Sequence, residues 1–128
     1  MQNTVVVHFS DGSVLKGITN NFFPNKDKFH LTDKDTGEVL EILLSGLKAV
    51  FFVKGFDGDP AYRERSDVER TGLGKKIQVD FNDGEVLVGY SQGYTPNRPG
   101  FFVFPADPQS NNDRVFVVTA ATRATRFL

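Results

Sequence analysis

An internal repeat constrains the fold of this 128-residue chain more than any other feature of its sequence. The stretch VVVHFSDGSVLKG begins at residue 5, and IQVDFNDGEVLVG begins 72 residues later, at residue 77. Aligned without a gap, residues 5–25 and 77–97 share nine identical positions, where about one would arise by chance. The repeat predicts two copies of one structural unit, and a weaker match continues as far as Phe52 and Phe127.

Each copy opens with the alternation of apolar and polar residues that is typical of a half-buried β-strand. Residues 5–9 and 77–81 alternate in this way, and an Asp-Gly pair follows them in both copies. This pair predicts a tight hairpin, because glycine tolerates the positive φ that primed hairpin turns require. The second strand of the hairpin is predicted at about 14–23 in the first copy and 86–94 in the second.

Gly17 and Gly89 lie inside this second strand, where glycine normally weakens pairing. Its presence in both copies predicts a geometric need, since a strand in a small closed sheet must bend to serve both sides of a barrel. Three more strands follow in each copy. They are predicted at 29–33, 39–44 and 47–53 in the first copy, and at 101–105, 114–120 and 122–128 in the second.

The stretch VVVHFSDGSVLKGITNNFFPNKDKFHL resembles the first motif of Sm-like barrels, and LEILLSGLKAVFF is similar to their closing strand pair. Other SH3-like barrels, including the PRC-barrel type, fit the same residues almost as well. The tandem arrangement, with AVFFVKGFDGDP closing the first copy, also resembles uncharacterised bacterial proteins. Two features depart from the Sm-like pattern: no helix precedes the first strand, and the polar loop that contacts RNA has no evident counterpart.

The predicted fold class is therefore all-β, with two tandem five-stranded SH3-like (Sm-like) small barrels packed as a pseudo-symmetric pair. Residues 1–54 form the first barrel and residues 76–128 the second. Residues 55–75 differ in composition from both copies, with charges of alternating sign and few apolar side chains. This composition is typical of a connector or of a single short helix around 61–70. Because a barrel of this size is marginal alone, the two are expected to pack together.

Composition and charge narrow the function classes. The chain has no cysteine, which excludes disulfides and thiolate metal sites. Its net charge is −1, with six Lys/Arg against six Asp/Glu in residues 1–54 and five against five in residues 76–128, so neither copy has the basic excess of nucleic-acid binders. No export signal opens the sequence, and the longest apolar run is too short for a membrane span. We expect a cytoplasmic protein with no membrane contact.

Sites for a metal ion, a cofactor or a catalytic group are not predicted. The two histidines, His8 and His30, lie on different predicted strands, whereas a usual metal site needs three or four converging ligands. The turn that begins at Asp33 has an incomplete calcium-loop pattern, and GLGKK from Gly72 lacks residues of a P-loop. No nucleophile with its base and no carboxylate pair can be nominated, so the chain is not expected to be an enzyme.

Arg114, Arg123 and Arg126 are the one mildly basic feature, near the end of the second copy. By strand alternation Arg123 and Arg126 point to opposite faces unless a bulge intervenes. Charges on an edge strand ordinarily discourage edge-to-edge aggregation, so solvated edge residues are the ordinary interpretation. As nucleic-acid contacts, the three arginines belong only to the alternative hypothesis that follows.

The leading functional hypothesis is a non-catalytic interaction or regulatory module, without a cofactor, that binds an unknown protein partner through a loop face or an exposed strand edge. It follows from a duplicated scaffold that carries no catalytic pattern, and fold alone does not fix function. The alternative is RNA or single-strand nucleic-acid binding by an Sm-like surface, which the barrel resemblance implies. A third hypothesis is a sensor that binds a small molecule or nucleotide between the barrels.

Overall fold

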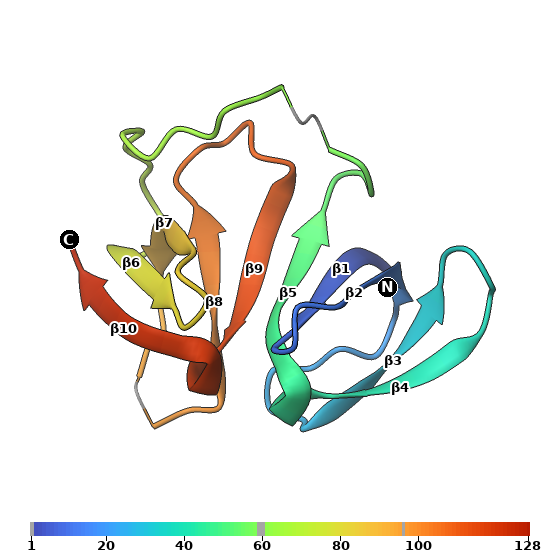
Figure 1. Cartoon of the computed structure of the whole chain (residues 1–128). Helices are drawn as coiled ribbons and strands as arrows, with labels where there is room; N and C mark the ends of the chain where they lie inside the picture. Colours follow the sequence, from blue (N-terminus) through green and yellow to red (C-terminus); the bar gives the residue numbers. More distant parts are fainter. Residues whose placement is uncertain (1, 59–60, 96) are drawn as a thin grey trace.

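The alternating segments of the sequence form β-strands in the computed structural model, which describes residues 2–58, 61–95 and 97–128 (Figure 1). The first half of the chain contains β1 (Asn3–Phe9), β2 (Val14–Thr19), β3 (Lys28–Asp33), β4 (Val39–Leu43), the 3₁₀ turn η1 (Leu44–Gly46) and β5 (Leu47–Val53). The second half contains β6 (Lys75–Phe81), β7 (Val86–Ser91), β8 (Gly100–Pro105), β9 (Asn112–Val118), the 3₁₀ turn η2 (Thr119–Ala121) and β10 (Thr122–Phe127). The all-β prediction is confirmed.

The ten strands form one open antiparallel sheet in the order β10-β6-β7-β8-β9-β5-β1-β2-β3-β4. The prediction of two separate five-stranded barrels is therefore not what the structure shows. The sheet is continuous because β5 of the first half pairs with β9 of the second, with Ala49 opposite Val117 and Phe51 opposite Val115. Within each half the strand order is the same, since β5-β1-β2-β3-β4 and β10-β6-β7-β8-β9 run from the fifth strand to the fourth.

The joining of the halves has a physical cause in β5, whose seven residues are all buried. Val50 and Phe52 point into the hydrophobic cluster of the first half. Phe51 and Val53, on the other face of the same strand, pack into the cluster of the second half. A strand that is apolar on both faces must be covered on both faces, so the two lobes of the sheet lie on either side of it (Figure 1).

The strand β9 of the second half also contributes side chains to both clusters. Phe116 and Val118 join the cluster of the first half, whereas Val115 and Val117 belong to that of the second. Each half therefore completes its core with side chains from the other. The two clusters are contiguous with one central strand pair, and neither would be closed if that pair were separated.

The repeated Asp-Gly pairs form hairpins, as predicted, but in a longer turn than the primed two-residue type. Gly12 and Gly84 have φ values of 94° and 93°, while no other residue type has a positive φ in the described part of the chain. In the first hairpin the N–H of Phe9 bonds to the carbonyl of Ser13, and the N–H of Gly12 to that of Phe9. This pattern is typical of a three-residue loop that ends in a left-handed glycine.

Gly17 and Gly89 are required where two strands approach each other closely. A Cβ atom on Gly17 would lie 2.1 Å from the backbone oxygen of Thr32, and one on Gly89 would lie 2.2 Å from that of Phe104. Gly17 pairs with Val5 on one side and with Asp33 on the other, so it lies where β2 passes from one neighbour to the next. The predicted geometric need is therefore present, and its cause is close backbone approach.

The connector between the halves runs from the end of β5 to the start of β6 at Lys75. The short helix considered around residues 61–70 does not form, because those residues are irregular. Residues 59–60 of the connector lie outside the described residues, as does Pro96 of the repeat. Across the described ranges, no helix has the length and apolar character needed to cross a bilayer.

Candidate functional site

A groove with a volume of about 630 Å³ opens where the two halves meet, at the end of the molecule that carries η1 and η2. In Figure 1 this is the lower end, where the β2–β3 and β7–β8 connections approach the two 3₁₀ turns. The groove is lined by residues of these four segments and by the end of β9: Asn25, Lys26, Asp27, Leu44, Ser45, Asn97, Arg98, Pro99, Val118, Thr119 and Ala120. Both halves thus contribute equivalent segments to one depression.

The two loops beside the groove are built from the same backbone hydrogen bonds. In the first half, the N–H of Lys26 bonds to the carbonyl of Phe23 at 3.0 Å, and in the second, that of Arg98 bonds to Thr95 at 3.3 Å. Each loop is then tied to its own 3₁₀ turn. The N–H of Leu44 bonds to the carbonyl of Asp27, and the N–H of Thr119 to that of Pro99, both at 2.9 Å.

This shared construction places a basic residue at the same position of each loop. Lys26 and Arg98 follow the repeated Asn25 and Asn97, and both basic side chains are exposed. Neither forms an ion pair with another described residue. A negatively charged ligand group can therefore meet two unengaged cations at this groove without first breaking an internal contact.

The lining between the two cations is largely apolar. Leu44 and Val118 are almost fully buried, and Pro99 and Ala120 lie beside them. Asp27 is the one acidic residue of the lining, so the two basic residues outnumber it. An apolar depression with a few charged groups at its border is the usual form of a recognition site.

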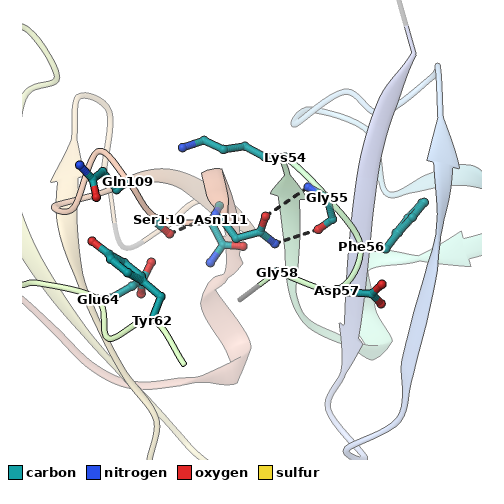
Figure 2. Close-up of a pocket in the computed structure, with 11 residues that line it drawn as sticks. Lys54, Gly55, Phe56, Asp57, Gly58, Tyr62, Glu64, Gln109, Ser110 and Asn111 are labelled. Carbon is teal, nitrogen blue, oxygen red and sulfur yellow. Dashed lines mark hydrogen bonds between the residues drawn. The ribbon is translucent and has the colours of Figure 1, made fainter. Parts of the chain in front are cut away.

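A larger hollow, of about 800 Å³, lies under the connector between the end of β5 and the β8–β9 loop (Figure 2). Its polar groups are mostly engaged with one another. The side-chain amide of Asn111 donates to the carbonyl of Gly55 at 2.8 Å and accepts the Gly55 N–H at 3.2 Å, as the dashed lines in Figure 2 show. These bonds fasten the connector to the second half, so we interpret this hollow as structural.

The connector is also fastened at Asp107, which is buried. Its carboxylate accepts hydrogen bonds from the Tyr62 hydroxyl and, at 2.9 Å, from the backbone N–H of Arg65. These bonds, that from Tyr62 foremost, lower the pKa of Asp107, and the same contact raises the pKa of Tyr62. A carboxylate held in this way is a structural anchor and not a free acid or base.

Lys48 forms the main ionic contact between the halves. Its ammonium lies 2.7 Å from the Asp83 carboxylate, also contacts Glu85, and lies 4.7 Å from the centre of the Phe81 ring. Burial alone disfavours the charged ammonium, but the hydrogen bonds to both carboxylates outweigh it and raise the pKa of Lys48. The hydrogen bond from Lys48 is likewise the main reason that the pKa of Asp83 is lowered.

The two histidines lie apart from any metal-binding arrangement. His8 packs on the Phe51 ring, with the ring centres 4.5 Å apart, and burial followed by the nearby Lys48 charge lowers its pKa. His30 accepts or donates a hydrogen bond with Asn21 at 2.9 Å and lies 3.9 Å from Glu41. Among the described residues, no three His, Asp or Glu side chains are placed to hold a metal ion.

The structure does not bring the three candidate arginines together. Arg114 lies on β9, with its guanidinium carbon 4.4 Å from the centre of the Phe52 ring and 4.7 Å from that of Phe102. Arg123 and Arg126 are exposed on β10, which is separated from β9 by three strands in the sheet. A register shift between Thr122 and Ala124 does interrupt the alternation beside Arg123.

Sequence reasoning missed Lys26 and Arg98 as site residues. The signal was present, because both follow an Asn that the two copies share. The sequence does not show that these two residues belong to one site, because only the folded sheet places the two loops beside one groove.

The model of a protein family of unknown function matches residues 1–128. No curated protein and no solved structure matches the chain. The site must therefore be interpreted from its own geometry.

Proposed function

Since this chain belongs over its whole length to DUF6982, a family of unknown function, we propose its role from its own residues: a non-catalytic interaction module that binds a partner protein in the groove between its halves. The observation that carries this proposal is the placement of Lys26 and Arg98, from equivalent loops, beside the apolar surface of Leu44 and Val118. The segment that fits such a groove presents an apolar side chain together with a carboxylate.

The chemistry of the groove supports binding more than turnover. Its lining contains a lysine, an arginine and one aspartate, with no histidine and no hydroxyl that is bonded to a base. The Thr119 hydroxyl donates to the backbone carbonyl of Arg98 at 2.8 Å, so it is engaged in holding the loop. Groups that recognise charge and apolar shape are therefore present, and no lining hydroxyl has a base beside it to activate it as a nucleophile.

The architecture of each half bears on the same proposal. We keep the relation of each half to an Sm-like or other SH3-like unit as a proposal, supported by five short antiparallel strands, a Gly-containing hairpin and a mid-strand glycine. Binding residues are commonly carried on loops that a rigid scaffold positions. The groove residues come from loops of this kind in both halves.

The experiment that tests the groove is selection of a random peptide library on the purified protein, followed by affinity measurement of the enriched peptides. We expect these peptides to combine an acidic and an apolar residue, and Arg98→Glu to weaken their binding about tenfold or more, because like charges then face each other. The matched control is Arg63→Glu, an exposed connector residue that does not line the groove. Equal binding by the wild type and Arg98→Glu would contradict the proposal.

RNA or single-strand binding through Arg114, Arg123 and Arg126 is the second candidate. Its support is weaker, because Arg114 is stacked on two phenylalanine rings and three strands separate it from the other two arginines. It predicts binding of a generic single-stranded RNA that falls steeply with salt. An RNA affinity of that kind, reduced by Arg123→Glu and unaffected by Arg98→Glu, would replace the peptide-binding proposal.

A further inference from the structure

The contact between the two halves is a contact between non-equivalent strands. The 3₁₀ turns η1 and η2 precede the fifth strand of each half, so Lys48 corresponds to Arg123 and Phe52 to Phe127. By this correspondence β5 is equivalent to β10, and β9 is equivalent to β4. The chain therefore pairs the fifth strand of its first half with the fourth strand of its second.

The same two kinds of strand remain unpaired at the ends of the sheet. β4 is the outermost strand on one side, and β10 is the outermost on the other. Each has one neighbour only, β3 for β4 and β6 for β10, so each presents a row of backbone N–H and C=O groups along its outer edge. The sheet thus has two free edges, one formed by a fourth strand and the other by a fifth strand. These are the same two kinds of strand that pair inside the chain.

Both outer strands also expose large apolar side chains. Val39 and Leu43 of β4 are 66% and 52% exposed, and Phe127 of β10 is 51% exposed. Phe127 corresponds to Phe52 and Leu43 to Val118, and these two residues of the internal contact are 4% and 5% exposed. Each outer strand therefore leaves uncovered an apolar side chain whose equivalent is buried at the internal contact.

Charge distinguishes the two edges from each other. β10 carries the exposed Arg123 and Arg126, whereas β4 carries the exposed Glu41, and Asp11 lies in the hairpin that corresponds to the one contacted by Lys48. Glu41 lies 3.7 Å from Lys28, in an exposed pair that is weak and easily exchanged, and the exposed Arg126 lies 3.9 Å from the partly buried Asp80. Two β10 edges would place arginines together, but a β10 edge meets acidic groups on a β4 edge.

We propose that copies of this chain associate head to tail, with β10 of one copy pairing antiparallel with β4 of the next, as β5 pairs with β9 within the chain. The internal register, Val50 opposite Phe116 and Phe52 opposite Arg114, places Thr125 opposite Glu41 and Phe127 opposite Val39. In this arrangement Arg123 meets Asp11, as Lys48 meets Asp83. Because the contact joins two different surfaces, it repeats from copy to copy and builds a ring or a filament.

This inference is independent of the peptide groove, because none of the groove residues lies on β4 or β10. It also gives the edge arginines a second role. Charges that discourage a β10 edge from pairing with its own kind also select the β4 edge as its partner.

The first experiment is disulfide trapping in a chain that has no cysteine of its own. Glu41→Cys and Thr125→Cys are made in separate chains of different tag length, and are mixed under mild oxidation. Residues directly opposite in an antiparallel pair have the spacing that a disulfide needs, so we expect a mixed dimer as the main covalent product. Arg63→Cys mixed with Glu41→Cys is the control for random collision. Products from like chains only, or a yield no greater than that of the control, would overturn the proposal.

The second experiment measures assembly of the unmodified protein by sedimentation at rising concentration. We expect the mass to rise from 14.3 kDa to multiples of it, and Arg123→Glu to raise the concentration needed by about tenfold. Arg63→Glu is expected to change nothing. A wild-type protein that stays at the monomer mass throughout, while circular dichroism shows it folded, would overturn the proposal, as would equal assembly of the Arg123→Glu protein.

Discussion

At the scale of single residues, Gly17 and Gly89 determine whether the second strand of each half can take its place. Both have an ordinary φ, so their requirement differs from that of the hairpin glycines Gly12 and Gly84. What they provide is room for a neighbouring backbone oxygen. The sequence indicates that the position matters, since both copies share it, but the reason depends on a strand that follows more than ten residues later.

The first prediction concerns these two residues. Gly17→Ala and Gly89→Ala are each expected to lower the free energy of unfolding by roughly 2 kcal/mol or more, because the new methyl group meets backbone that cannot move aside. Urea unfolding followed by circular dichroism measures the change. Gly46→Ala is the control, since a Cβ there has nothing within 4 Å, and its effect should stay within about 0.5 kcal/mol.

At the scale of elements, the strands and hairpins could be predicted from local patterns, because alternation and turn residues are local signals. The fifth strand was placed at 47–53, which are its observed bounds, and most others were placed within one or two residues. The second strand was predicted too long at 14–23, since β2 ends at Thr19. The two 3₁₀ turns were not predicted, because a segment of three residues is too short to show a periodic pattern of apolar side chains.

The hairpin between β6 and β7 gives the second prediction, through Lys48 and Asp83. A carboxyl whose pKa is lowered by folding stabilises the protein above its unfolded pKa, near 3.9, and this contribution is lost as the pH falls through the lower folded value. Asp83→Asn is therefore expected to destabilise the protein at pH 7, by at most about 1 kcal/mol, because the Asp83 carboxylate is half exposed and solvent screens the pair. The difference from wild type should shrink as the pH falls below about 4.

Thermal unfolding at a series of pH values measures this difference. Asp113→Asn is the matched control, since Asp113 is an exposed acid on β9 that takes part in no described ion pair. A stability gap for Asp83→Asn that stays constant from pH 7 to pH 3 would show that Lys48 and Asp83 do not interact as described.

At the scale of the whole molecule, the prediction of two barrels failed because β5 and β9 pair between residues such as Ala49 and Val117, which are far apart in the chain. Local patterns carry no information on such pairing. One signal was available, since residues 49–53 and 115–118 are apolar without alternation, which is typical of strands that are covered on both faces. The groove could not be predicted for the same reason, because its two basic residues line one depression only through this pairing.

The third prediction follows from the shared cores. A fragment of residues 1–58 is expected not to fold alone, because Phe51 and Val53 would lose the cluster of the second half, and Phe116 would be missing from the first. The full chain should instead unfold in one cooperative transition. Far-ultraviolet circular dichroism, and the near-ultraviolet signal of the Phe and Tyr side chains, measure both points when they are recorded on the same urea series. Two separate transitions, or a fragment with native-like strand content and a sharp unfolding curve, would contradict the description.

The burial of both faces of β5 also limits how this chain can change over generations. A substitution at Phe51 changes the packing of the second half, whereas one at its neighbour Phe52 changes the packing of the first half. The two halves are therefore not independent of each other. Neither can be exchanged for a foreign unit, or diverge at this strand, without a matching change in the other.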